Sequence, residues 1–324
     1  MNADAARWVL RRVLLAAPVV LGVALLTFTL LHAAPGDPVY LLAGDAGDAA
    51  YYADIRAKYG LDRPFAEQLL RYGRSLLTGD LGYSFTYHAP VARVLLDHAG
   101  ASLLLGATAI GLAMLLGIGG SVFLVLVPSR LAYTVLRVGG AVAYAAPVFW
   151  TGQVLMLVVS LKLGLLPVSG MSTTRASLTG LAYASDVARH LVLPGLTLAL
   201  PFLAVLARVC HASLLAAVRE PFALAAYARG FTRRRVVLRH ALPHALVPVA
   251  ALVGQHAGQI VAGAALTEVV FAWPGIGSLV LHASQHRDYP LVTAAFIVIS
   301  ISVVFFNAVA DGVCAWLDPR IRLH

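Results

Sequence analysis

The stretch Leu103–Val127, LLLGATAIGLAMLLGIGGSVFLVLV, runs for 25 residues without a charged side chain. As a helix rising about 1.5 Å per residue, it can cross the roughly 30 Å of hydrocarbon in a bilayer. The whole chain shows the same bias, since 60% of its residues are hydrophobic and only 12% are charged. A soluble domain carries about 25% charged residues. We therefore predict an all-α integral membrane protein.

Five further apolar runs have a comparable length: Val13–Leu31, Val138–Leu161, Leu191–Val209, Ala245–Val270 and Leu291–Val309. The first of these resembles a signal peptide, but it is longer than a usual signal-peptide core and we interpret it as an uncleaved first span. The sequence thus predicts six transmembrane helices. We divide the chain into an N-terminus with the first helix (1–31), an extracytoplasmic loop (32–101) and a core of five helices (102–324).

The distribution of positive charge predicts the orientation. With the N-terminus inside, the inner segments hold fourteen arginines, whereas the two short outer loops hold only Lys162, Arg175, Arg189 and Arg287. Positive residues in short loops stay on the cytoplasmic side, so both termini are predicted to be cytoplasmic. The long first outer loop contains a helical stretch, Tyr51–Leu77, broken at Gly60 and Pro64.

Several function classes are excluded or disfavoured. The net charge of +9 comes without a basic stripe in a soluble stretch, so nucleic-acid binding is not expected. Cys210 and Cys314 both fall at the predicted cytoplasmic membrane edge, which argues against a disulfide, and two lone cysteines make no metal site. We expect no metal and no cofactor in this chain.

Enzyme activity is not predicted either. A phosphate-binding loop needs Gly-Lys-Ser or Gly-Lys-Thr, and neither Lys58 nor Lys162 stands in that context. The sequence has no His-Glu-x-x-His motif. The histidine pairs His240/His244 and His282/His286 are spaced four apart, but no local carboxylate or cysteine completes them, and we interpret the spacing as chance.

The inner loop at about 210–244 is the most informative segment. Ser213–Arg229 is predicted to be helical with a possible break at Pro221, and Gly230 is predicted to end that helix. Thr232 can cap a second short helix that carries Arg233, Arg234 and Arg235. A helix–glycine–helix element suits docking to a partner protein. A basic connector lying on anionic lipid is the equally acceptable alternative.

The fifth apolar run is unusually polar. Gln255 and Gln259 lie four residues apart and therefore face the same way on a helix. They either line a path for passing solute or lie in a helix–helix seam, for which Gly254 and Gly258 permit close approach. Glu268, at the outer end of this run, either borders the entrance of the path or anchors the helix at the interface.

The inner loop also resembles a known family. Ala225, Ala226, Gly230, Leu242 and Pro243 match, at the right spacing, the cytoplasmic loop of ABC-importer permeases; Leu224 and His240 replace that family's Glu and Ile. Other segments resemble the B-type subunits of its peptide branch. They are Pro35-Gly36-Asp37-Pro38, Tyr59–Pro64, Gly79–Ser84, Glu268–Gly277 with Arg287–Pro290, and Leu317–Arg320.

The resemblance implies a type I, six-helix permease subunit of a dipeptide/oligopeptide/nickel ABC importer in a bacterial-type inner membrane. It implies three kinds of partner besides lipid: a second permease, two ATPase subunits or domains that bind ATP and Mg²⁺, and an extracytoplasmic solute-binding protein. The matched loop residues, with Arg233–Arg235 adding charge-assisted contacts, would couple to the ATPase. Peptide is the expected cargo; nickel or another small ligand is the alternative. A stand-alone secondary transporter is less favoured, because intramembrane ionisable residues and repeats are not seen.

Overall fold

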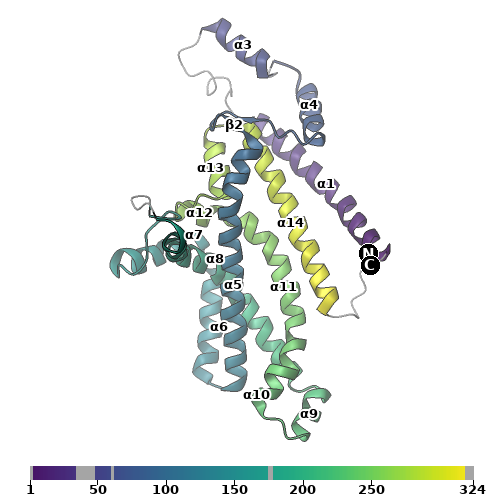
Figure 1. Ribbon diagram of the computed structural model, residues 1–324, viewed down its shortest axis with the longest axis vertical. Coiled ribbons are helices and arrows are strands. Elements are labelled where there is room, and N and C mark those ends of the chain that lie inside the picture. The colour runs from purple at the N-terminus through teal and green to yellow at the C-terminus, as the bar shows by residue number, and fades with distance from the viewer. Residues whose placement is uncertain (1–2, 34–47, 60–61, 174–177, 318–324) are drawn as a thin grey trace. The chain divides into compact units, whose positions relative to one another are not determined.

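The computed structural model describes residues 3–33, 48–59, 62–173 and 178–317, and it is built mainly of helices (Figure 1). Contacts divide the chain into two compact units. Unit 1 comprises Met1–Gly100 and Gly275–Ser302, and unit 2 comprises Ala101–Pro274 and Val303–His324. The motif Pro35–Pro38 and the residues Gly60, Leu61 and Asp318–Arg320 lie outside the described part.

Unit 1 contains the first predicted span and the first outer loop. Its elements are α1 (Ala3–Ala33), α3 (Ala49–Tyr59), α4 (Phe65–Leu77), β1 (Tyr83–Ser84), β2 (Ala89–Pro90), α13 (Ile276–Gln285) and the first parts of α5 (Val91–Leu126) and α14 (Tyr289–Leu317). The separate helices α3 and α4 agree with the predicted helical stretch and its break. The strands β1 and β2 pair antiparallel, with Ser84 opposite Ala89.

A buried carboxylate joins distant parts of unit 1. Asp288 is fully buried and accepts hydrogen bonds from the Ser84 hydroxyl (2.5 Å) and the Thr86 backbone N–H (3.0 Å). It also accepts one from the N–H of Leu291 in the first turn of α14 (3.3 Å). Burial and the nearby Asp288 charge raise the pKa of Tyr87. These bonds connect the segment Ser84–Thr86 to the start of α14 within unit 1. The predicted division of the chain at residues 31 and 101 stays a prediction.

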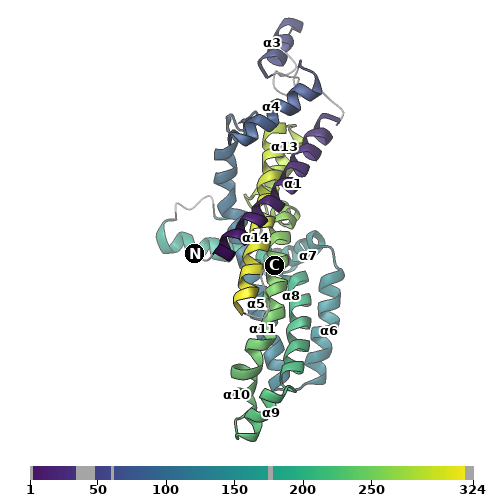
Figure 2. The ribbon, with the colours of Figure 1, turned by 90° about the vertical axis from the view of Figure 1, so that its right-hand side faces the viewer.

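Unit 2 contains the remaining helices. They are α6 (Arg130–Ala145), α7 (Val148–Leu155), α8 (Gly180–Ala217), α9 (Pro221–Ala228), α10 (Arg233–Arg235), α11 (Leu242–Gly263), α12 (Ala265–Val270) and two π-helical segments, η1 (Met156–Lys162) and η2 (Val236–Ala241). Figures 1 and 2 show α6 and α8 side by side. Small residues let α5 approach α8, since a Cβ on Gly195 would lie 3.0 Å from Thr108.

The third apolar run does not form the single straight helix that the sequence predicts. α6 ends at Ala145, and the following pair α7–η1 leaves it at 110°. The cause is local, because Pro147 forces Ala146 into an extended conformation (ψ 135°) and has no N–H to continue the ladder. This pair is either a broken span or a segment that turns back.

The other predicted spans agree with the helices of the structure to different degrees. Within the described residues, four stretches are long and apolar enough to cross a membrane: Val91–Leu126, Gly180–Ala217, Arg233–Gly258 and Tyr289–Gly312. They contain or overlap four of the six predicted runs. The bent pair would be a fifth. The run Val13–Leu31 lies inside α1, whose described apolar part is the shorter stretch Ala17–Leu30. The count of six spans stays a prediction.

Two glycines make the contact between α11 and α14 very close. A Cβ on Gly254 would lie 1.7 Å from the Cβ of Ala310 and 2.9 Å from its Cα, and one on Gly258 would lie 3.1 Å from the Cα of Val303. No side chain fits at Gly254 unless the two helices separate. The predicted close approach at Gly-x-x-x-Gly is thereby confirmed, and it joins two helices of the same chain.

We predict that Gly254→Ala lowers the free energy of unfolding by about 1–3 kcal/mol, the usual cost of overpacking. Thermal unfolding in detergent, followed by tryptophan fluorescence, measures this as a lower Tm. Gly119→Ala on α5 is the matched control, because nothing lies within 4 Å of its added Cβ. It should leave Tm unchanged or slightly raised. Equal Tm values for the two variants would contradict the seam.

Candidate functional site

The inner loop folds as a short helical elbow. We use the name elbow for residues 218–241, which contain α9, the turn at Gly230, α10 and η2. Figures 1 and 2 show α9 and α10 together at one end of unit 2. The predicted break at Pro221 is confirmed, since Pro221 begins α9. The first turn of a helix has no use for the N–H that proline lacks.

The turn at Gly230 ends α9 in a defined hydrogen-bonded motif. The N–H of Phe231 donates to the carbonyl of Ala226 (3.2 Å), and that of Gly230 donates to Tyr227 (2.9 Å). Together with the positive φ of Gly230 (+81°), these bonds form a Schellman cap. A Cβ on Gly230 would meet no atom within 4 Å, so glycine is needed for its backbone conformation and not for space.

The two alanines of the elbow that match the family pattern have different environments. Ala226 is buried with Ala223 and Val236 in a small apolar cluster, against which Phe231 packs. Ala225 is exposed. The family resemblance assigned both alanines to the loop that would couple to the ATPase. In the structure Ala226 instead closes α9 onto η2, and only Ala225 faces outward.

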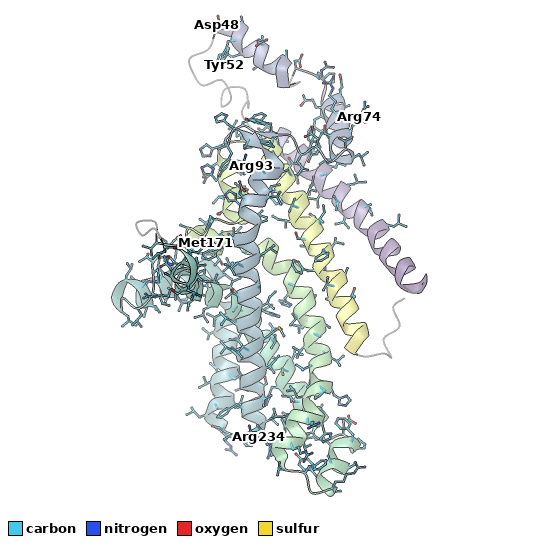
Figure 3. All side chains as sticks on the ribbon, viewed as in Figure 1. Asp48, Tyr52, Arg74, Arg93, Met171 and Arg234 are labelled. Carbon is cyan, nitrogen blue, oxygen red and sulfur yellow. The ribbon has the colours of Figure 1, made fainter. Side chains whose placement is uncertain are left out.

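The three arginines also have separate environments. Arg233 donates from Nη2 to the carbonyl of Val125 in the last turn of α5 (2.7 Å). Arg235 places its guanidinium carbon 4.4 Å from the centroid of the Phe231 ring, and that ring in turn stacks on His240. Arg234, the middle residue of α10, is exposed (Figure 3).

The second arm of the elbow continues into α11. Thr232 stands at the start of α10, but its side chain forms no cap there, contrary to the prediction. α10, η2 and α11 then follow without a break, with Leu242 half-buried and Pro243 exposed at the start of α11. The second arm of the elbow therefore runs directly into α11, and the two belong to one stretch, Arg233–Gly258, that is long and apolar enough to cross a membrane.

α9 presents an apolar face to the outside. The exposed fraction of Leu224 is 56%, and those of Phe222 and Tyr227 are both 37%. Leu224 and Tyr227 flank the buried Ala223 and Ala226 on one side of α9. Phe222 lies on the other side, with its ring 4.5 Å from that of His244. An exposed apolar face on a short helix is typical of a contact surface.

The polar residues of α11 separate into two sets. Gly254 and Gly258 face α14, as described, and the ring of His256 stacks on Phe202 of α8 at 4.6 Å. Gln255 is exposed. The side chain of Gln259 lies outside the described residues.

Glu268 faces packed protein. It is fully buried on α12 and accepts a hydrogen bond from the Ser102 hydroxyl of α5 (2.7 Å). Nearby, the Trp273 indole N–H donates to the carbonyl of Ala101 (2.8 Å). Both bonds join α5 to the segment after α11, across more than 160 residues of sequence. The Glu268 side chain thus holds α12 to α5, and its predicted place at the entrance of the path or at the membrane interface stays a prediction.

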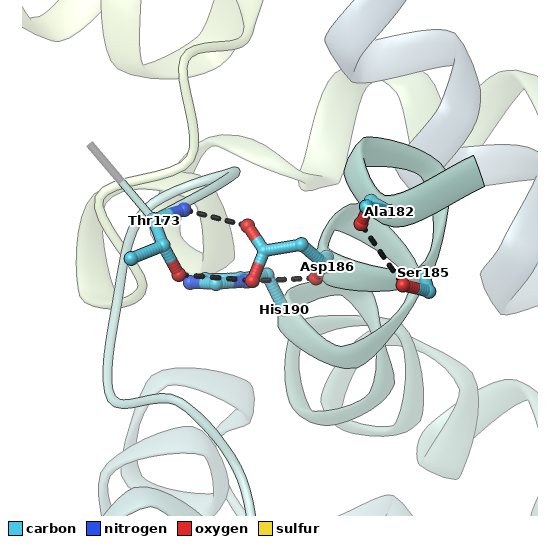
Figure 4. Close-up of polar contacts among 5 residues, drawn as sticks. All are labelled: Thr173, Ala182, Ser185, Asp186 and His190. Carbon is cyan, nitrogen blue, oxygen red and sulfur yellow. Dashed lines mark hydrogen bonds and ion pairs between the residues drawn. The ribbon is translucent and has the colours of Figure 1, made fainter. Parts of the chain in front are cut away.

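A further polar contact was not expected from the sequence. The carboxylate of Asp186, near the start of α8, accepts hydrogen bonds from the backbone N–H (2.6 Å) and hydroxyl (2.9 Å) of Thr173 (Figure 4). His190 lies one turn further along α8, with Nδ1 3.6 Å from the same carboxylate. The only signal was an acidic residue shortly before an apolar run, which says nothing of its partner.

Comparison with known proteins identifies relatives over nearly the whole chain. Residues 109–323 match the model of the binding-protein-dependent transport system inner membrane component, and residues 5–106 match the N-terminal model of such membrane components. The dipeptide transport system permease DppB of Escherichia coli K12 is 35% identical over 98% of each chain. The oligopeptide permease AppB of Bacillus subtilis 168 is 31% identical over 98% of this chain and 99% of that one.

Two other relatives complete the comparison. The di/tripeptide permease DppB of Pseudomonas aeruginosa UCBPP-PA14 is 34% identical over 97% of this chain and 98% of that one. Among solved structures, a chain of the inward-facing MetNI methionine ABC transporter matches with a TM-score of 0.52 and 14% identity, over 70% of this chain and 97% of that chain. The last similarity concerns the fold alone.

Proposed function

This chain belongs to the family of binding-protein-dependent transport system inner membrane components, and from that premise we propose that it is one of two permease subunits of an ATP-driven peptide importer. The relatives named above transport dipeptides, di/tripeptides and oligopeptides. Their names support peptide over nickel as the cargo. Family membership also disfavours a stand-alone secondary transporter.

The proposed partners follow from the same premise. A second permease would complete the path, a solute-binding protein would deliver cargo outside, and two ATPase subunits or domains would bind ATP and Mg²⁺. This chain contributes the elbow and no nucleotide-binding loop. We propose an inner-membrane location with both termini in the cytoplasm, supported by the fourteen arginines of the inner segments.

The observation that carries the coupling proposal is the construction of the elbow. Its inner cluster and Schellman cap hold α9 at a defined angle to η2, while the exposed Leu224, Ala225 and Tyr227 form the contact surface. Because α10, η2 and α11 are continuous, force applied by an ATPase to the elbow would move α11 as one body. The π-helical turn η2 lies between α10 and α11, and such turns occur often at functional sites.

We expect Gly230→Val to weaken ATPase co-purification, or to uncouple ATP hydrolysis from peptide uptake, without unfolding the membrane helices. A β-branched residue in the left-handed conformation is strained by about 1–2 kcal/mol, and the added side chain otherwise meets open space. Gly230→Asn is the matched control, because asparagine tolerates this conformation, and it should retain most of the coupling. A Val variant with stoichiometric ATPase and normal uptake would refute the docking assignment.

We further propose that Gln255 and Gln259 line the path and offer hydrogen bonds to passing peptide groups. The exposure of Gln255 supports this. Glu268 is left out of the path, since it is buried against Ser102, and we assign it to holding α12 on α5.

Replacing both glutamines with leucine should slow ATP-dependent uptake several-fold, because the path loses amide donors and acceptors. The variant should keep its second permease and ATPases on size-exclusion chromatography. Uptake of labelled dipeptide into proteoliposomes is the measurement. If the complex falls apart instead, the glutamines lie in a seam between subunits and the path assignment is wrong.

A further inference from the structure

A cavity of about 450 Å³ opens in unit 2 next to the elbow. Its wall is formed by the last turn of α5, the turn that connects α5 to α6, the first turn of α6, one face of α8, and α10. The volume lies within the range of ordinary ligand pockets, roughly 300–1,000 Å³. None of the residues assigned above to the solute path contributes to it.

Two arginines from different elements give this cavity its charge. Arg130 begins α6 and Arg233 belongs to α10, and no carboxylate is among the lining residues. Arg233 is held in place by its bond to Val125, which uses one of its five N–H donors. Within the described residues, neither arginine forms a salt bridge. The cavity therefore has a net positive charge that nothing in the described chain neutralises.

A third polar group of the cavity is unsatisfied. The Nδ1 atom of His211 is buried and has no hydrogen-bond partner, while its ring rests against Tyr133 of α6. A buried polar atom without a partner costs about 1–3 kcal/mol and points to an unseen ligand or water. The first turn of α6 adds free N–H groups, with Ser129 capping only that of Ala132.

Apolar side chains form another part of the wall. Leu124, Pro128 and Leu215 line the cavity beside the arginines, and α6 continues outward from it with Leu131 and Val135 exposed (75% and 62%). The cavity lies where α5 ends and α6 begins, at the expected edge of the membrane. A free inorganic anion would leave this apolar wall unused, whereas an amphiphile with an anionic head fits both parts.

We propose that this cavity binds the phosphate headgroup of an anionic membrane phospholipid, with Arg130 and Arg233 as its cationic partners. The apolar side chains of Leu124, Pro128 and Leu215 would contact the glycerol and the upper part of the acyl chains. The lipid would tie α6 to α10 and so steady the elbow against the bundle. The inference rests on the membrane edge lying at these helix ends, and it does not depend on the identity of the cargo. Anionic lipid would then be an activator of coupling through the elbow.

The test uses the full-length chain in neutral detergent, titrated with dioleoylphosphatidylglycerol or dioleoylphosphatidylcholine and read by native mass spectrometry. Arg130→Gln/Arg233→Gln should weaken phosphatidylglycerol binding by about tenfold or more, since each basic residue contributes on the order of 1 kcal/mol to anionic-lipid attraction. Arg137→Gln/Arg234→Gln is the matched control, with the same charge loss on the same two segments outside the cavity, and should stay within about twofold of wild type.

Additional variants and competing ligands distinguish lipid binding from misfolding, simple anion binding and protein docking. Arg130→Lys/Arg233→Lys should keep much of the binding, which shows that charge and not misfolding explains the Gln variant. Equal binding of phosphatidylcholine and phosphatidylglycerol, or equal losses in both Gln pairs, would overturn the proposal. So would inorganic phosphate that displaces the lipid at equal concentration, because the apolar wall would then contribute nothing. Displacement of the lipid by bound ATPase would make the cavity a protein-docking site and would likewise overturn it.

Discussion

Hydrocarbon offers no hydrogen-bond partner to a peptide group, and the rest of this structure depends on that constraint. Each long helix satisfies most of its own backbone, except at internal prolines such as Pro194 and Pro201 of α8. Each place where a helix ends or bends must be satisfied by protein or lie outside the membrane. The α5 helix shows how. Its last turn receives the Arg233 guanidinium at Val125, and one turn earlier the Ser121 hydroxyl donates to the carbonyl of Ala207 in α8. In its first half, α5 receives the Trp273 indole N–H at Ala101 and donates from Ser102 to Glu268. Polar groups thus fasten α5 to its neighbours at two levels, where burial of apolar surface alone gives little selectivity in lipid.

The elbow is the complementary case, a segment whose backbone is satisfied without a long helix. Its Schellman cap closes the end of α9, and the cluster around Ala226 and Phe231 gives it a small core of its own. The elbow connects α8 to α11, two helices that pack on each other, and passes into α11 with no intervening loop. A rigid connection of this kind transmits a displacement, whereas a flexible loop would absorb it. The proposed lipid at Arg130 and Arg233 would brace the same element from the membrane side.

Much of this architecture is encoded locally and could be predicted. The break at Pro221 and the helix end at Gly230 depend on residues within one or two turns, and the structure agrees with both. Four of the six apolar runs likewise overlap long apolar helices. The bend at Pro147 also has a local cause that the sequence contains. The prediction of a straight span gave more weight to the length of the apolar run than to this proline. The burial of Ala226 and Glu268 could not be predicted, because it depends on partners such as Val236 and Ser102 on other elements. The same holds for Asp288, whose hydrogen bonds to Ser84 and Thr86 span some 200 residues.

The central claim, that the elbow is a cytoplasmic contact surface for an ATPase, is tested most directly by single-cysteine labelling. In a chain with Cys210 and Cys314 replaced, Arg234→Cys and Asp62→Cys would each be treated with a membrane-impermeant maleimide in right-side-out and in inside-out vesicles, with and without bound ATPase subunits. The account predicts that the cysteine at position 62 reacts only from outside and that at 234 only from inside. It also predicts several-fold slower labelling at 234 when the ATPase is bound, and no change at 62. Labelling of position 234 from outside, or an unchanged rate in the presence of the ATPase, would contradict it.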